Sequence, residues 1–287
     1  MSALSKGIAA RVDGTDAFFA VDPRIMRAFV GTLIVGVWMA LGFAFALGAN
    51  AYLLVGIPIT IAFQVLVVRR PLRTLWVRAA PPLTFTPRWA LLVLVVAVAP
   101  AVIAAGAVRN GDLVLVCYGL AGMVGAVGAV DSLRTMDGLA VRSTIRATLI
   151  TSSILVSVMV AYRMATGGFT GNLPAAVASA VLSVATYLPV VFVLEEAFFR
   201  GLLDTYLHGS TPGADRATAL YGSALWGVWH LPVASVDLGL LLIPYLVVVH
   251  SALGYVLVTS WRRTGNLGAP GVAHAVSDAL RNAVAVL

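Results

Sequence analysis

Charged residues are scarce in this chain. They make up 11% of its 287 residues, whereas hydrophobic residues make up 60%, and the mean hydropathy is +0.97. This balance excludes an ordinary water-soluble domain, in which about a quarter of the residues are charged. The apolar residues occur in runs of about 20, the length of helix that crosses a bilayer. The sequence therefore predicts an integral membrane protein.

Cysteine is nearly absent as well. Cys117 is the single cysteine, which excludes an internal disulfide and argues against a metal site made of thiolates. We expect Cys117 to be a small packing residue. The first 27 residues carry charges of both signs and lack a short apolar run with a cleavage site, so they do not indicate a removable signal peptide.

Nine apolar runs are long enough to form helices. Eight membrane helices remain an alternative if one of the runs is interfacial or re-entrant. The fold class is therefore predicted to be all-α, a polytopic transmembrane helical bundle of about eight or nine helices. The expected helices cover residues 28–48, 51–68, 89–107, 113–130, 147–163, 176–208, 217–234, 239–260 and 268–286.

The chain divides into three parts by charge and polarity. We expect residues 1–27 to form a cytoplasmic N-terminal segment, residues 28–175 to form scaffold helices, and residues 176–287 to form the helices that carry the functional residues. The scaffold assignment rests on the near absence of ionisable side chains from its apolar runs, because polar groups at bilayer depth usually mark function.

Arginine placement predicts which side of the membrane each loop occupies. Most arginines lie in the segments that are cytoplasmic when the N-terminus is inside, and the opposite loops keep only Arg109 and Arg163. This distribution also explains the formal net charge of +7 without a nucleic-acid partner. The composition is rich in arginine and poor in lysine, which favours a bacterial cytoplasmic membrane as the location.

Glutamate occurs only twice, as the adjacent pair Glu195 and Glu196 within an apolar run. An ionised carboxylate at the centre of a bilayer costs at least about 2.5 kcal/mol and needs compensation. Arg200 follows Glu196 by one helical turn, which predicts an ion pair between them. Glu195 points about 100° away around the helix and must face another partner.

Histidines supply candidate partners for Glu195. His230 and Glu195 lie almost equally far from the loop that joins their helices, which predicts that they meet at the same depth. His274 is followed one turn later by Asp278, which can orient the imidazole or bind substrate. A carboxylate and imidazoles in a protected cavity can activate water. His250 matches no such pattern and is expected to hydrogen-bond between helices.

Three motifs occur in order in the last third of the chain: EEAFFRG from Glu195, WGVWH ending at His230, and RTGNL followed by HAVSD from His274. Over about residues 180–287 they resemble the CPBP family of intramembrane proteases. That family includes the type II CAAX prenyl endopeptidases and bacterial bacteriocin-processing or immunity proteins. The order of the three motifs is more specific than EExxxR alone.

The resemblance implies a helical bundle with a catalytic cavity open towards the cytoplasm. Glu195 would be the general base that activates water, and His230 would hold that water or a metal. His274 and Asp278 would complete the site and stabilise the oxyanion. The resemblance thus implies a CAAX-type endopeptidase, and a metalloendopeptidase if an ion is bound.

The same resemblance assigns supporting residues. Glu196 and Arg200 would fix the geometry of the first helix. Trp226 stands where the family usually has phenylalanine, which changes the packing beside His230 without removing a reactive group. Asp278 stands where asparagine is frequent and would favour a cation over an oxyanion.

The residues leave two versions of the chemistry open. Glu195, His230 and His274 could hold Zn²⁺, but HExxH is absent and zinc ligands usually lie closer in sequence. Metal-free activation of water needs only the carboxylate and the imidazoles.

The expected partners are membrane lipid and a membrane-associated peptide or protein substrate, and no nucleic acid. The family name suggests prenylated CAAX peptides, whereas the bacterial composition favours a leader peptide or a membrane-anchored regulator. One alternative function is a non-catalytic immunity or scaffold protein that binds a peptide or partner in the same cavity. Transport is disfavoured because the ionisable residues cluster in the last third and no repeat is present.

Overall fold

The computed structural model describes residues 22–79, 83–169, 171–208, 216–234 and 238–287. Within these residues it contains nine helices and no strand, which confirms the predicted all-α bundle. Most of the expected N-terminal segment, residues 1–27, lies outside the described part of the chain.

Two of the helices change character along their length, and the others are uninterrupted. Helix α3 continues as the π-helix η2, and α7 continues as the π-helix η4 and then as α8. The bounds are α2 Pro23–Ala44, α3 Ala49–Ala62, η2 Phe63–Val68, α4 Pro87–Asn110, α5 Leu113–Arg134, α6 Gly138–Thr166, α7 Leu173–Val191, η4 Phe192–Asp204, α8 Thr205–His208, α9 Arg216–Trp229, α10 Leu242–Thr264 and α11 Gly268–Val286.

Polar side chains explain where several of these helices begin. Thr86, Asp112, Asp137 and Asn172 each accept a hydrogen bond from a backbone N–H in the first turn of α4, α5, α6 and α7, respectively. Such caps satisfy N–H groups that have no partner within the helix. Because Asp137 caps α6, this helix begins nine residues before the predicted start at residue 147.

Seven of the helices are long and apolar enough to cross a membrane, and α9 and α11 are not among them. Helix α9 contains 14 residues, or roughly 21 Å of helix, which is shorter than the hydrocarbon core. The predicted span 217–234 is therefore wrong at its end: α9 ends at Trp229, and a short 3₁₀ turn that contains Pro232 follows.

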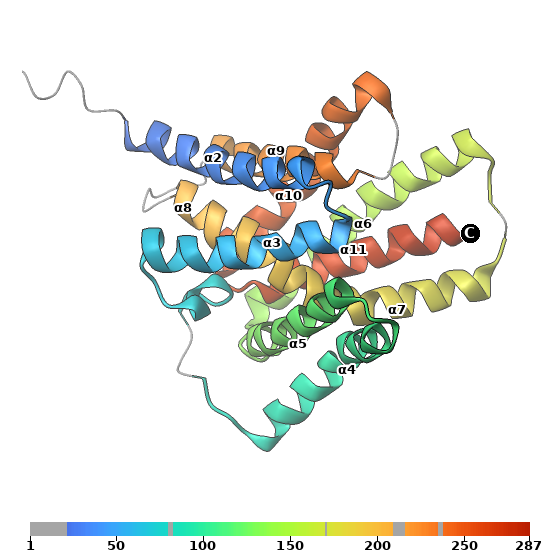
Figure 1. Ribbon diagram of the computed structural model, residues 1–287, viewed down its shortest axis with the longest axis horizontal. Helices are drawn as coiled ribbons and strands as arrows, with labels where there is room; N and C mark the ends of the chain where they lie inside the picture. Colours follow the sequence, from blue (N-terminus) through green and yellow to red (C-terminus); the bar gives the residue numbers. More distant parts are fainter. Residues whose placement is uncertain (1–21, 80–82, 170, 209–215, 235–237) are drawn as a thin grey trace, which may run out of the picture.

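The helices pack with α11 between α6 and α7, while α9 lies against α10 and α4 lies against α5 at the edge of the bundle (Figure 1). The side of α4 that points away from the bundle carries large exposed apolar residues, including Leu91, Leu94 and Val102. Exposed apolar side chains on a spanning helix face lipid. Cys117 on α5 is exposed too, so the expectation that it packs inside is wrong.

One end of the bundle is held together by ion pairs and backbone hydrogen bonds. Asp204 at the end of η4 accepts three hydrogen bonds of 2.7–3.1 Å from Arg262 of α10. Buried Asp131 of α5 binds Arg73 at 2.8 Å. The loop that carries Arg73 also pairs with the α10–α11 turn, where Val77 and Asn266 form an antiparallel bridge. We refer to this end as the arginine end.

The loops that arginine placement predicts to be cytoplasmic thus meet at one end of the molecule. The other end contains the start of α3 and the contact between the α6–α7 loop and the C-terminus, where the N–H of Gly171 donates to the carbonyl of Leu287 at 2.8 Å. The two groups of loops are therefore on opposite sides of the bundle. An inside N-terminus remains a prediction that labelling can test.

Cysteine labelling should report this orientation. In a Cys117→Ala background, a cysteine at exposed Ala49 should react with a membrane-impermeant maleimide in intact cells. A cysteine at Arg70, an exposed residue of the arginine end, should react only after the membrane is permeabilised. The reverse pattern would place the N-terminus outside.

Candidate functional site

Glu195 and Glu196 lie in the π-helical segment η4, Phe192–Asp204. Pro189 precedes this segment. Because proline has no backbone N–H, it cannot donate a hydrogen bond within the helix. π-helical turns are rare in proteins, and those that do occur often lie at functional sites. Both glutamates are buried, Glu196 completely and Glu195 with 9% of its surface exposed, and they turn to different partners.

Glu196 forms the centre of a buried ionic cluster. Its Oε1 lies 3.0 Å from an Nη of Arg200 and 2.7 Å from Nδ1 of His274. The predicted pair of Glu196 with Arg200 is confirmed. The contact with His274 was not expected, because sequence spacing does not reveal that α11 approaches η4. The negative charge of this buried carboxylate is therefore compensated by two neighbouring side chains.

Trp226 of α9 connects this cluster to Glu195. The guanidinium carbon of Arg200 lies 4.0 Å from the centroid of the indole ring, a cation–π contact. The indole Nε1–H donates a hydrogen bond of 3.1 Å to Oε2 of Glu195. Tryptophan at this position thus does more than change the packing beside His230, since phenylalanine could not donate this hydrogen bond.

His230 meets Glu195 as the depth argument predicts. Nδ1 of His230 donates to the carbonyl of Trp226 at 2.8 Å, because a carbonyl oxygen can only accept. This leaves Nε2 facing Oε2 of Glu195 at 3.9 Å. The separation is too long for a direct hydrogen bond and is one that a single water molecule can bridge.

His274 lies between two carboxylates. Nδ1 contacts Glu196, and Nε2 lies 3.5 Å from Oδ2 of Asp278, the residue predicted to share its helical face. Asp278 also forms an ion pair of 3.1 Å with Arg281. No role for Arg281 was predicted from the sequence. The spacing of three residues between Asp278 and Arg281 on one helix is the signal that could have identified this pair.

His250 is the other residue that the sequence analysis missed. Its ring centroid lies 4.2 Å from that of His230 and 4.8 Å from that of Trp226. Nδ1 of His250 donates to the carbonyl of Leu246 in its own helix at 2.8 Å, so the expected hydrogen bond between helices is wrong. Its position in a membrane-spanning segment was the available signal.

One cavity of about 270 Å³ brings the predicted catalytic residues together. Glu195, His230, His274 and Asp278 all line it, although they come from three helices. Helices of the predicted scaffold contribute walls as well. These wall residues include Asn50, Leu53, Tyr118 and Leu155.

The cavity extends away from the arginine end. Its lining includes Ala49, an exposed residue at the start of α3, and Arg281, whose side chain is 35% exposed. In the opposite direction, η4 continues with buried residues, including Phe198, Phe199 and Leu202. A separate cavity of about 310 Å³ lies at the arginine end and shares no lining residue with the first.

The direction of this cavity brings two predictions from the sequence into conflict: a cytoplasmic arginine end and a cavity open towards the cytoplasm. With the arginine end in the cytoplasm, the cavity that contains Glu195 extends towards the opposite face, not towards the cytoplasm as the resemblance implies. Only one of the two expectations can hold for this arrangement of helices. The labelling of Ala49 and Arg70 positions described above distinguishes them.

The side chains do not form a ready-made metal site. Among the residues that the structure describes, no three His, Cys, Asp or Glu side chains are placed to bind one ion. His274 directs both ring nitrogens to Glu196 and Asp278, whereas Nδ1 of His230 donates to a carbonyl and leaves Nε2 free. Glu195, His230 and His274 are thus not arranged as a three-ligand site in this structure.

Comparison with known proteins identifies a family. Residues 177–280 match the family model described as Type II CAAX prenyl endopeptidase Rce1-like. No curated protein and no solved structure is significantly similar to the chain. The match confirms the resemblance that the three motifs predict, and it indicates a CAAX-type protease function for this part of the chain.

The buried cluster should be critical for stability. Arg200→Met leaves the Glu196 carboxylate without its guanidinium partner in a buried place, and we expect a loss of about 3–5 kcal/mol in the free energy of unfolding. Arg281→Gln removes an exposed partner of Asp278 and should cost less than about 1 kcal/mol. Thermal unfolding of both variants in detergent measures the difference, and equal losses would contradict the assigned role of Arg200.

Proposed function

We propose that this chain is an intramembrane endopeptidase that hydrolyses a peptide bond of a membrane-associated substrate with water activated by Glu195. The proposal starts from the family match of residues 177–280. The single observation that carries it further is the position of Glu195, whose carboxylate lines a cavity within the bundle opposite Nε2 of His230.

In the proposed reaction, a water molecule lies between Glu195 and His230. Glu195 takes a proton from this water while the water oxygen attacks the carbonyl carbon of the scissile peptide bond. The carbon–nitrogen bond then breaks, and the proton passes to the leaving amine. Burial of Glu195 within the bundle strengthens each of these electrostatic interactions.

His230 orients the water in this mechanism. Its Nδ1–H is held by the carbonyl of Trp226, so the neutral imidazole presents an unprotonated Nε2 to the cavity. This nitrogen accepts a hydrogen bond from the second O–H group of the water, while Glu195 takes the proton of the first. Trp226 fixes both partners, because it donates to Glu195 and accepts from His230.

His274 is proposed to stabilise the oxyanion. Contacts of its two nitrogens with carboxylates, at 2.7 Å to Glu196 and 3.5 Å to Asp278, are both attractive when the ring carries two protons. The longer contact lies on the cavity side, where a developing negative charge can share the Nε2–H. Positioned donors of this kind supply several kcal/mol to acyl-transfer reactions. Asp278 holds the ring and is itself held by Arg281.

The substrate is proposed to be a leader peptide or a membrane-anchored regulator. The cavity of about 270 Å³ has room for a short extended stretch of backbone and contains both polar groups and apolar walls. The bacterial cytoplasmic membrane is the proposed location.

Replacing the proposed base should abolish turnover without unfolding the protein. Glu195→Gln keeps the size and the hydrogen bond from Trp226 but cannot take a proton, so we expect cleavage of a membrane-tethered peptide to fall at least about 100-fold in kcat. Asp204→Asn is the matched control, because it changes another buried carboxyl group of η4 that binds Arg262 and lies outside the cavity.

The control should lower stability but keep kcat per folded molecule. Binding of the peptide should survive in Glu195→Gln. Cleavage that is unchanged in this variant would exclude the mechanism, and peptide binding without cleavage by the unaltered protein would favour the non-catalytic alternative.

Removal of metal ions tests the water-activation step separately. Since the described side chains do not form a three-ligand site, peptide cleavage by the purified full-length protein should be unchanged after treatment with 1,10-phenanthroline and EDTA. Loss of cleavage that added Zn²⁺ restores would overturn the metal-free version.

A further inference from the structure

Another cavity, with a polar part and an apolar part, lies between α6 and α10, outside the proposed catalytic site. It has a volume of about 100 Å³, and none of its lining residues belongs to the cavity around Glu195. A single water molecule occupies far less space, so the cavity has room for a small polyatomic group. Its lining consists of Ser143, Arg146, Ala147, Ile150, Tyr255, Val256, Thr259, Ser260 and Arg263.

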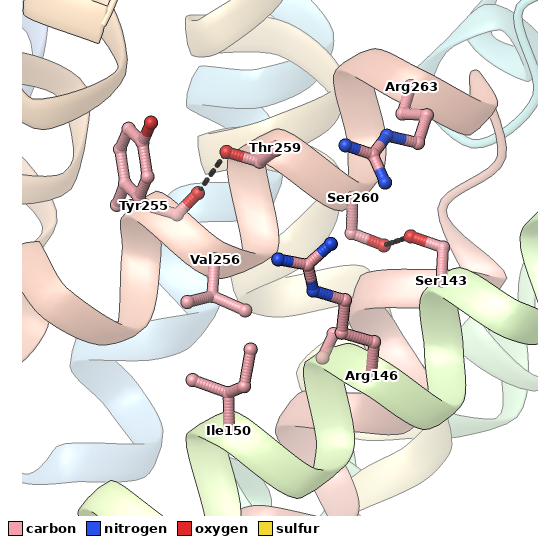
Figure 2. A pocket seen from close by; sticks show the side chains of 9 residues that line it. Ser143, Arg146, Ile150, Tyr255, Val256, Thr259, Ser260 and Arg263 are labelled. Carbon is pink, nitrogen blue, oxygen red and sulfur yellow. Dashed lines mark hydrogen bonds between the residues drawn. The ribbon is translucent and has the colours of Figure 1, made fainter.

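The polar part of this cavity is cationic. Figure 2 shows the guanidinium groups of Arg146, from α6, and Arg263, from α10, reaching into the same space. Neither arginine has a carboxylate within ion-pairing distance among the residues that the structure describes. Both arginines are exposed, so their guanidinium groups are accessible to an anion.

Hydroxyl groups border the two arginines. Ser143 and Ser260 are hydrogen-bonded to each other at 2.8 Å across the two helices, and this pair lies beside Arg263 in Figure 2. Each serine hydroxyl has one proton, so the member of this pair that accepts can still donate to an anion. Guanidinium forks and hydroxyl groups are the donors that bind phosphate oxygens.

The rest of the cavity is apolar. Ile150 of α6 and Val256 of α10 face each other on the side away from the Ser143–Ser260 pair, as Figure 2 shows. Both residues lie deeper in their helices than the arginines, which are nearer the arginine end. The cavity thus has a cationic part nearer the arginine end and an apolar continuation towards the middle of α6 and α10.

We propose that this cavity binds the phosphate group of an anionic phospholipid, with Arg146 and Arg263 as the two cationic contacts. One acyl chain of the lipid would lie along Ile150 and Val256. Anionic lipids are concentrated in the cytoplasmic leaflet, the side on which arginine placement puts this end of the bundle. The bound lipid would join α6 to α10.

The test uses the full-length protein in detergent and measures retention of lipid by native mass spectrometry. Phosphatidylglycerol should bind roughly tenfold more tightly than phosphatidylcholine, since the latter carries its own compensating cation. Arg146→Gln and Arg263→Gln should each weaken phosphatidylglycerol binding roughly tenfold, because each removes charged hydrogen bonds to phosphate. Arg142→Gln is the matched control: it lies one turn earlier on α6 and does not line the cavity.

Additional ligands and variants test whether the bound group is a lipid and whether this cavity is its site. Glycerol 3-phosphate carries the same phosphate chemistry without acyl chains, and tight binding of this soluble ligand would overturn a lipid as the source. Equal binding of both lipids, or equal effects of the Arg142 and Arg146 substitutions, would overturn the site itself. Should a glutamine variant fold poorly, Arg146→Lys and Arg263→Lys keep the charge and should weaken binding less than glutamine does.

Discussion

The compensation of buried charge by Glu196, Arg200 and His274 is the interaction on which the rest of the structure depends. Arg200 is 1% exposed and Glu196 is not exposed at all, so each group would be very costly in lipid without the other. Because His274 joins the pair from α11, the cluster also ties η4 to the last helix. The position of His274 in the cavity follows from this contact.

Trp226 links this structural cluster to the proposed chemistry. It lies over Arg200, donates to Glu195, and accepts from His230 through its carbonyl. The residue that differs from the family pattern therefore touches both the ionic cluster and the proposed catalytic pair. Its larger ring also contacts His250 and His274, so five polar side chains are arranged around one indole.

The two ends of the bundle have different roles. At the arginine end, Asp204 and Asp131 neutralise arginines from neighbouring segments, and the side chains between this end and Glu195 are closely packed. The cavity around Glu195 extends to the opposite end. The scaffold helices are also part of the site, since α3, α5 and α6 contribute walls of the cavity.

The sequence by itself determined the membrane environment, the approximate positions of most helices and the family resemblance of the last third of the chain, because apolar runs and ordered motifs are local patterns. It also predicted the Glu196–Arg200 pair and the meeting of Glu195 with His230, since one helix turn or one connecting loop sets those distances. Only the tertiary structure decided that His274 binds Glu196, that Trp226 donates to Glu195, that His250 lines the cavity and where that cavity leads. These features depend on the crossing of helices far apart in the chain, which no local spacing specifies.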